Sequence, residues 1–118
     1  MKEEKFVECV FFAEYENAMV VAKDWSLEKM TSIIIAQLRE EGPAISCYGF
    51  FVYLLSCWPI EKHLAIHETL GHILSAEMND IMGGGKMTAI YHLREALALA
   101  PDKEENKLQL EKLLDNVT

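Results

Sequence analysis

The chain contains few basic residues, and this scarcity argues against two large classes of partner. Lysine and arginine together number 11 against 19 acidic residues, so the formal net charge of the 118-residue chain is −8. A nucleic-acid-binding domain normally carries a basic patch, and so does a surface that binds anionic lipids. We therefore expect no nucleic-acid partner and no membrane partner, and the charge favours a basic protein or peptide.

Cysteine is also scarce, and the three residues, Cys9, Cys47 and Cys57, form no CxxC pair. An odd number without paired spacing argues against a disulfide framework or a zinc ribbon. Cys47 and Cys57 lie in an apolar segment, where we expect both to be buried. The N-terminal residues are acidic and lack the basic start and apolar core of a signal peptide. These features predict a cytoplasmic protein.

One long apolar run stands out, because residues 44–60 contain no charged side chain. A run of this length is at the lower limit of a membrane-spanning helix. Acidic residues flank it, with Glu40 and Glu41 before it and Glu61 after it, and no positive-inside bias is evident. Gly49 and Pro59 lower its tendency to insert still further. The sequence therefore predicts a buried central helix.

Apolar residues recur at every third or fourth position along most of the chain, which is the period of an amphipathic helix. No convincing pair of strands is present. We predict an all-α fold of a single domain over residues 1–118, with helices in antiparallel hairpins. The triple glycine at 83–85 predicts a loop, without the pattern of a phosphate-binding loop. The six predicted helices are Glu3–Ala22, Leu27–Glu41, Ala44–Trp58, Ile60–Met78, Met87–Ala100 and Lys103–Asn116.

The C-terminal half resembles a tetratricopeptide repeat, which is an antiparallel pair of helices found in stacked arrays. Small residues in that pattern let the two helices approach closely, and a proline ends the hairpin. The sequence departs from the pattern by several extra residues in the segment NDIMGGGK, so we predict one degenerate repeat. The match is best over residues 64–116 and rests on Leu70, Gly71, Ala89, Leu93, Ala96 and Pro101.

A weaker second copy of the pattern precedes it, between Ile34 and Pro59. The resemblance implies a stack of helical hairpins that binds protein and has no catalytic residues of its own. An unrelated compact helical bundle is the alternative architecture. In a stack, the first helix of each hairpin lines the binding face, which makes Gln37, His63 and His67 candidate partner-binding residues.

The histidines also invite a comparison with zinc sites. The string HETLGH differs from the HExxH motif, because His67 and His72 are five residues apart and lie about 140° apart around a helix. His63 and His67 are four residues apart and could touch one metal ion together, but two ligands do not complete a site. The only other histidine is His92. We therefore expect no metal and no cofactor.

The sequence predicts a small, acidic, all-α protein–protein interaction module without enzymatic activity and without a catalytic residue. Two alternatives remain open. One is a small helical metal-binding protein or enzyme that uses His63 and His67. The other is a structural homo-oligomer.

Overall fold

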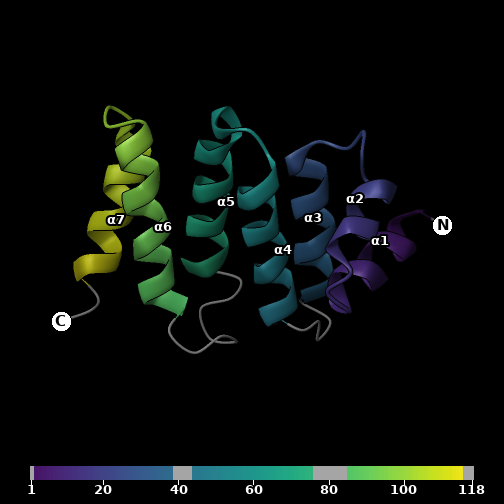
Figure 1. Cartoon of the computed structure of the whole chain (residues 1–118). Coiled ribbons are helices and arrows are strands. Elements are labelled where there is room, and N and C mark those ends of the chain that lie inside the picture. Colours follow the sequence, from purple (N-terminus) through teal and green to yellow (C-terminus); the bar gives the residue numbers. More distant parts are fainter. Residues whose placement is uncertain (1, 39–43, 76–84, 116–118) are drawn as a thin grey trace. The chain divides into compact units, whose positions relative to one another are not determined.

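Every element that the structure describes is helical, which confirms the predicted all-α fold. The computed structural model describes residues 2–38, 44–75 and 85–115. Within these ranges it contains seven α-helices and one short 3-10 helix, η1 (Figure 1). Their bounds are α1 Lys2–Phe11, α2 Tyr15–Val21, α3 Leu27–Leu38, α4 Ala44–Cys57, η1 Ile60–Lys62, α5 His63–Ser75, α6 Gly85–Leu99 and α7 Glu104–Asp115.

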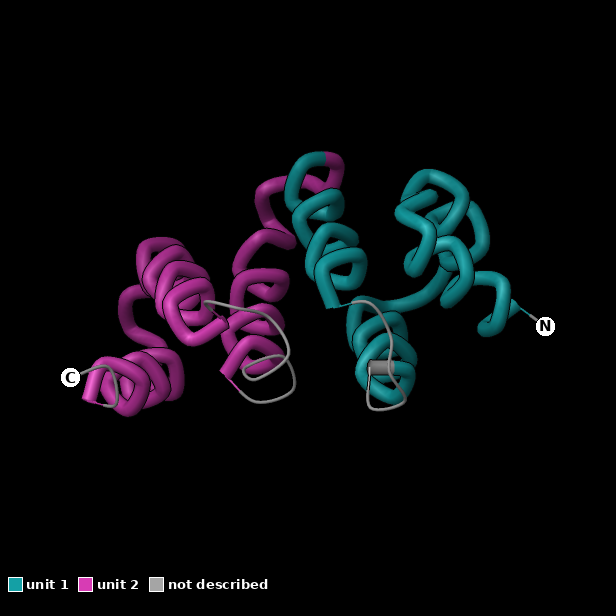
Figure 2. Tube along the Cα trace, turned by 90° about the horizontal axis from the view of Figure 1, so that it is seen from below, with its two compact units in different colours: residues 1–56 teal, residues 57–118 magenta. Residues whose placement is uncertain are grey.

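The chain divides into two compact units, which Figure 2 colours separately. Unit 1 is Met1–Ser56 and unit 2 is Cys57–Thr118. Unit 1 contains α1, α2, α3 and all of α4 except its last residue, and unit 2 contains η1, α5, α6 and α7. The organisation of the whole chain as a single domain stays a prediction.

The first predicted helix, Glu3–Ala22, is wrong in one respect, because two helices, α1 and α2, occupy this range and pack against each other. Ala13 lies between them with a φ of 59°, in the left-handed region. Its amide donates a hydrogen bond to the carbonyl of Val10 at 3.1 Å, and the amide of Glu14 donates one to the carbonyl of Cys9 at 2.8 Å. This pair of bonds is the Schellman motif, which satisfies the last carbonyls of α1 and turns the chain into α2.

Aromatic side chains form much of the core of unit 1. The ring of Phe6 on α1 meets Phe50 on α4 edge-on, with centroids 5.5 Å apart, and it meets Trp25 at 5.2 Å. Phe50 also contacts Phe51. Phe6, Phe50 and Phe51 are fully buried. Edge-to-face packing of this kind adds specific geometry to the burial of large apolar surfaces, so α1 and α4 are held in a defined arrangement.

The apolar run forms α4, and its inward side is buried through Ala44, Cys47 and Leu54 together with the two phenylalanines. In the described part of the chain, no helix combines the length and the apolar character that crossing a membrane requires. The prediction that Cys57 is buried is wrong. Cys57 is the last residue of α4 and is exposed, whereas Cys47 is buried.

In unit 2, α5 and α6 form an extensive antiparallel contact (Figure 1). Gly71 on α5 allows close approach, since a Cβ atom added there would lie 2.8 Å from Cδ2 of Leu93 on α6. Ala89 and Ala96 lie on the same face of α6 as Leu93, and all three are fully buried. Small residues therefore flank Leu93 on the buried face of α6, and the contact of Ala96 with α5 stays a prediction.

The predicted ends of the helices in unit 2 need small corrections. The helix predicted to begin at Ile60 starts as η1 and becomes α-helical only at His63. The helix predicted to begin at Met87 begins at Gly85, the last glycine of the triple, which is buried. Most of the predicted NDIMGGGK loop lies outside the described residues.

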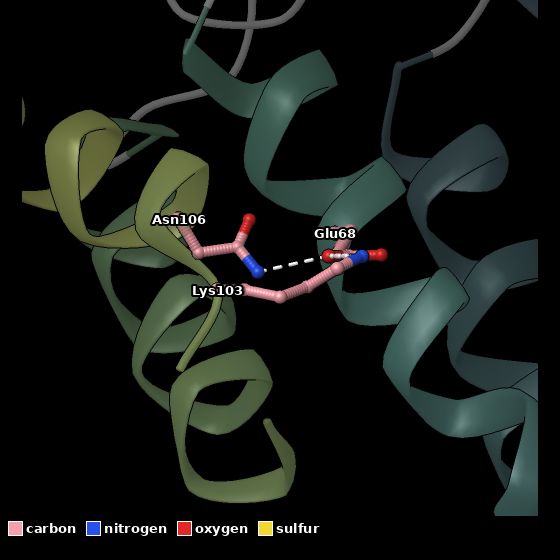
Figure 3. Close-up of polar contacts among 3 residues, drawn as sticks. All are labelled: Glu68, Lys103 and Asn106. Carbon is pink, nitrogen blue, oxygen red and sulfur yellow. Dashed lines mark hydrogen bonds and ion pairs between the residues drawn. The ribbon is translucent and has the colours of Figure 1, made fainter. Parts of the chain in front are cut away.

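A polar contact joins α5 to the start of α7 (Figure 3). Oε2 of Glu68 accepts a hydrogen bond from Nζ of Lys103 at 2.7 Å and another from Nδ2 of Asn106 at 2.8 Å. Asn106 is buried, with an exposed fraction of 3%, whereas Lys103 is exposed. Burial alone would raise the pKa of the Glu68 carboxyl, but the hydrogen bonds from Lys103 and Asn106, together with the nearby charges of Lys103 and His72, outweigh this effect and lower the pKa. The carboxylate is therefore kept ionised where α5 meets α7.

Candidate functional site

Unit 1 contains a groove between α1 and α3. Its volume is about 680 Å³, which lies within the range of ligand and peptide pockets. Successive turns of α1 place two rows of side chains along it, and α3 supplies the opposite wall. The groove is lined by Glu3, Glu4, Val7, Glu8, Phe11, Phe12, Ile33, Ala36 and Gln37.

The groove combines apolar side chains with negative charge. Val7, Phe11 and Ile33 supply partly exposed apolar surface. Phe12, just past the end of α1, has an exposed fraction of 73%. An aromatic side chain left in water gains on the order of 1.5–3 kcal/mol when it becomes fully buried. This groove-lining surface therefore favours contact with another apolar surface.

Three carboxylates accompany the apolar side chains. Glu3 and Glu4 lie on the first turn of α1 and Glu8 lies on the next turn, and all three are exposed. In the part of the chain that the structure describes, no ammonium or guanidinium group lies within ion-pair distance of them. Their negative charge is therefore uncompensated by the described side chains and can attract a basic group.

The predicted residue Gln37 lies in this groove, on the α3 side, and is partly exposed. Its amide can both donate and accept hydrogen bonds beside the apolar wall. The other two predicted residues, His63 and His67, lie on α5 in unit 2. The structure therefore places the three candidates in different units, and their role in binding a partner stays a prediction.

His63 is the first residue of α5 and is half-buried. Its Nε2 lies 3.0 Å from the carbonyl oxygen of Trp58. Because a carbonyl only accepts, the ring donates its Nε2 proton in this bond. The ammonium of Lys62 lies over the ring of Trp58, 4.6 Å from the ring centroid. These contacts hold the segment that precedes α5 against its first turn.

His67 is nearly buried, with an exposed fraction of 8%, and leaves little surface for a partner. Its Nδ1 lies 2.9 Å from Nδ1 of His92 on α6, whose exposed fraction is 1%. One ring must donate a proton and the other must accept it, so at least one of the two rings is neutral. Burial lowers the pKa of both rings, that of His92 to about 4.

The pair of His67 and His92 was not predicted, because His92 is 25 residues further along the chain. A signal for its burial was present, since His92 shares the face of α6 that carries Ala89, Leu93 and Ala96. The helical period alone predicts that His92 is buried inside unit 2. The period does not predict which residue of α5 His92 contacts.

The arrangement of the described histidine and cysteine side chains bears on metal binding and on nucleophilic chemistry. No group of three or more histidine, cysteine, aspartate or glutamate side chains there has the arrangement of a metal site. His67 is buried and His72 is exposed, in keeping with their separation around the helix. Burial raises the pKa of the Cys47 thiol to about 12, which leaves it protonated and a poor nucleophile at neutral pH.

Comparisons with known proteins add no relative. No family model matches the chain, and no significant match is found among curated proteins or among solved structures. The candidate site therefore rests on the geometry of the chain itself.

Proposed function

We propose that this chain is a protein–protein interaction module, and that the groove between α1 and α3 binds a basic, amphipathic segment of another protein. One observation carries the proposal. Apolar side chains, including the highly exposed Phe12, line the same groove as three carboxylates without an ion-pair partner in the described residues. A segment with apolar side chains on one face and lysine or arginine beside them matches both properties.

The two kinds of contact have different tasks. Burial of Phe11, Phe12 and Ile33 supplies most of the affinity, because removal of apolar surface from water is the larger favourable contribution. The carboxylates of Glu4 and Glu8 steer a basic segment into the groove and disfavour acidic ones. Gln37 offers a polar contact at the edge of the apolar wall. This division predicts binding that weakens with salt without being abolished by it.

The resemblance to tetratricopeptide repeats supports the same class of function, since those repeats bind protein segments. It remains part of the proposal, as do the cytoplasmic location and the absence of enzymatic activity. No catalytic role is assigned to any residue.

A titration with designed peptides tests the proposal. The probe is a fluorescent amphipathic peptide with leucines at helical spacing and lysines directly beside the leucine face. Its control has glutamates in place of the lysines. We expect the lysine peptide to bind and the glutamate peptide to bind at least about tenfold more weakly.

Variants assign the binding to the groove. Glu4→Gln with Glu8→Gln is expected to weaken the binding of the lysine peptide by about three- to tenfold, since each exposed charge pair contributes about 0.2–1 kcal/mol. The matched control is Glu105→Gln with Glu111→Gln on α7, which removes the same charge from exposed positions of unit 2. Phe12→Ser is expected to weaken binding more than the charge variant does. Equal affinity for the two peptides, or an equal effect of both glutamate pairs, would refute the proposal.

A further inference from the structure

Another hollow in unit 1 has the opposite charge. Its volume is about 500 Å³, and α1 supplies Lys2 and Lys5 while the turn that follows α2 supplies Lys23. Val20, Val21 and Trp25 form its apolar wall. Among the described residues that line it, Asp24 alone is acidic. In a chain with a net charge of −8, a convergence of three lysines on one cavity is a local reversal of sign.

The three ammonium groups lack an ion-pair partner among the described residues. By contrast, Lys103 and Lys107 in unit 2 each pair with a glutamate. Three positive charges around one cavity exceed the single negative charge of Asp24, and an anion in the cavity would offset the remaining repulsion among them. The cavity therefore has the electrostatics of an anion site.

The cavity lies on a different side of α1 from the acidic groove. At about 100° per residue, Glu3, Glu4 and Val7 project to one side of the helix, and Lys2 and Lys5 project to the other. The sign of the charge thus changes across a single helix. Whatever binds in the cavity has chemistry opposite to that of the basic segment proposed for the groove.

The apolar wall is fixed in place. The ring of Trp25 packs against the fully buried Phe6, with centroids 5.2 Å apart. Nζ of Lys29 lies 4.4 Å from the centroid of the Trp25 ring and adds a cation–π contact. Val20 has an exposed fraction of 70% and leaves apolar surface beside the lysines. A held aromatic ring and an exposed aliphatic side chain provide contacts for a flat apolar body.

We propose that this cavity binds a small organic anion, in which a carboxylate or phosphate group is attached to an aromatic body. The anion lies among Lys2, Lys5 and Lys23, and the aromatic body packs against Val20 and Trp25. The volume suits one such molecule. The site is separate from the groove, so this proposal does not depend on the proposed function.

Titration of the isotopically labelled full chain, followed by amide and indole NMR signals, tests the site. The probes are 2-naphthoate, 2-naphthyl phosphate and the uncharged 2-naphthamide. We expect both anions to shift the signals of Val20, Val21 and the Trp25 indole, and the amide to bind at least about fivefold more weakly. Tighter binding of the phosphate than of the carboxylate would identify phosphate as the preferred group, and the reverse would identify carboxylate.

Two variants with equal charge change complete the test. Lys5→Gln with Lys23→Gln is expected to weaken the binding of both anions by about fivefold or more. Lys86→Gln with Lys112→Gln, in unit 2, is expected to leave their affinity unchanged. Circular dichroism checks that both variants are folded.

Three results would overturn the proposal. The first is equal binding of the neutral and anionic probes, and the second is an equal loss in both lysine variants. The third is a set of probe-induced shifts that avoids Val20, Val21 and Trp25. Concentration-dependent shifts of these signals without a probe, together with slower diffusion, would assign the cavity to a second copy of the chain instead.

Discussion

Nδ1 of His67 on α5 and Nδ1 of His92 on α6 lie 2.9 Å apart, and both rings are nearly excluded from water. The bond needs one donor and one acceptor, so protonation of both rings would break it and place two positive charges side by side. Burial has the largest effect on the pKa of His67 and lowers it. Two other groups act on that ring, since the Glu95 carboxylate on α6 raises its pKa and His63 on α5 lowers it.

This relationship predicts that the free energy of unfolding falls as the pH decreases from about 6.5 toward 4. In the unfolded chain a histidine titrates near 6.5, and burial lowers both pKa values in the folded chain, that of His92 to about 4. Below 6.5 the unfolded chain therefore binds more protons than the folded chain, and stability that is fully present above 6.5 is lost. The loss contributed by His92 is on the order of 2–3 kcal/mol by pH 4.

Urea unfolding at a series of pH values measures this loss. Carboxylates also titrate toward pH 4, so the informative quantity is the difference between variants. His67→Leu with His92→Phe is expected to reduce the pH dependence of the free energy of unfolding between about pH 6.5 and 5. His72→Gln, which changes an exposed histidine of α5, is expected to leave that pH dependence unchanged. A wild-type curve that is already flat across this interval would contradict the prediction.

A second prediction concerns Ala13, which has a φ of 59°. A residue with a Cβ atom is strained by about 1–2 kcal/mol in this region, and glycine is not. Glycine loses about 0.4–1 kcal/mol of this advantage through the greater freedom of the unfolded chain. Ala13→Gly is therefore expected to stabilise the chain by about 0.5–1 kcal/mol.

Thermal and urea unfolding test the Ala13 prediction with Ala98→Gly as the matched control. Ala98 is exposed within α6, where the same substitution is expected to destabilise by about 1 kcal/mol. Opposite signs at the two positions would support the Schellman geometry. Destabilisation at both would contradict it.

The turn at Ala13 is a feature of the fold that could not be predicted from the sequence. Apolar spacing located most of the helices, since a helix with one buried face must repeat apolar residues at its own period. The break between α1 and α2 was missed because a left-handed residue at a helix end is usually glycine, and here it is alanine. No glycine marks that turn in the sequence, although the hydrogen bonds of the Schellman motif are local.

The candidate groove was predictable only in part. Glu4, Glu8 and Val7 have the spacing of one helix face, so an acidic and apolar stripe on α1 follows from the sequence. The position of this stripe opposite Ile33 and Gln37 depends on the contact between α1 and α3. That contact is part of the tertiary structure, which the spacing within one helix does not predict. The contact between His67 and His92 could not be predicted from the sequence for the same reason.

A third prediction concerns the approach of α5 and α6. A Cβ atom at Gly71 would lie 2.8 Å from Cδ2 and 2.9 Å from Cγ of Leu93, and Leu93 is fully buried with little room to move. The gain in helix propensity from Gly71→Ala is about 1 kcal/mol, and overpacking costs about 1–3 kcal/mol. We expect a net destabilisation of about 0.5–2 kcal/mol.

A double-mutant cycle with Leu93→Ala checks the Gly71 prediction. Leu93→Ala alone creates a cavity and is expected to cost about 2–5 kcal/mol. The Cβ atom that Gly71→Ala introduces then has room, so the double variant should be more stable than the sum of the two single effects predicts. Strict additivity would show that Gly71 and Leu93 do not constrain each other.

The last prediction concerns the hydrogen bonds that join α5 to α7, in which one oxygen of Glu68 accepts from both Lys103 and Asn106. The two donors differ in burial, and this difference sets their contributions. Lys103 is exposed, so its ion pair is screened by water and Lys103→Gln is expected to change stability little. Asn106 is buried, and Asn106→Ala removes a hydrogen bond to a charged group, which is expected to cost about 1.5–3 kcal/mol. Hydrogen exchange of the α7 amides measures the effect locally, and it should accelerate in Asn106→Ala far more than in Lys103→Gln. Equal acceleration in both variants would contradict the prediction, because the exposed ion pair of Lys103 would then hold α7 against α5 as strongly as the buried amide of Asn106.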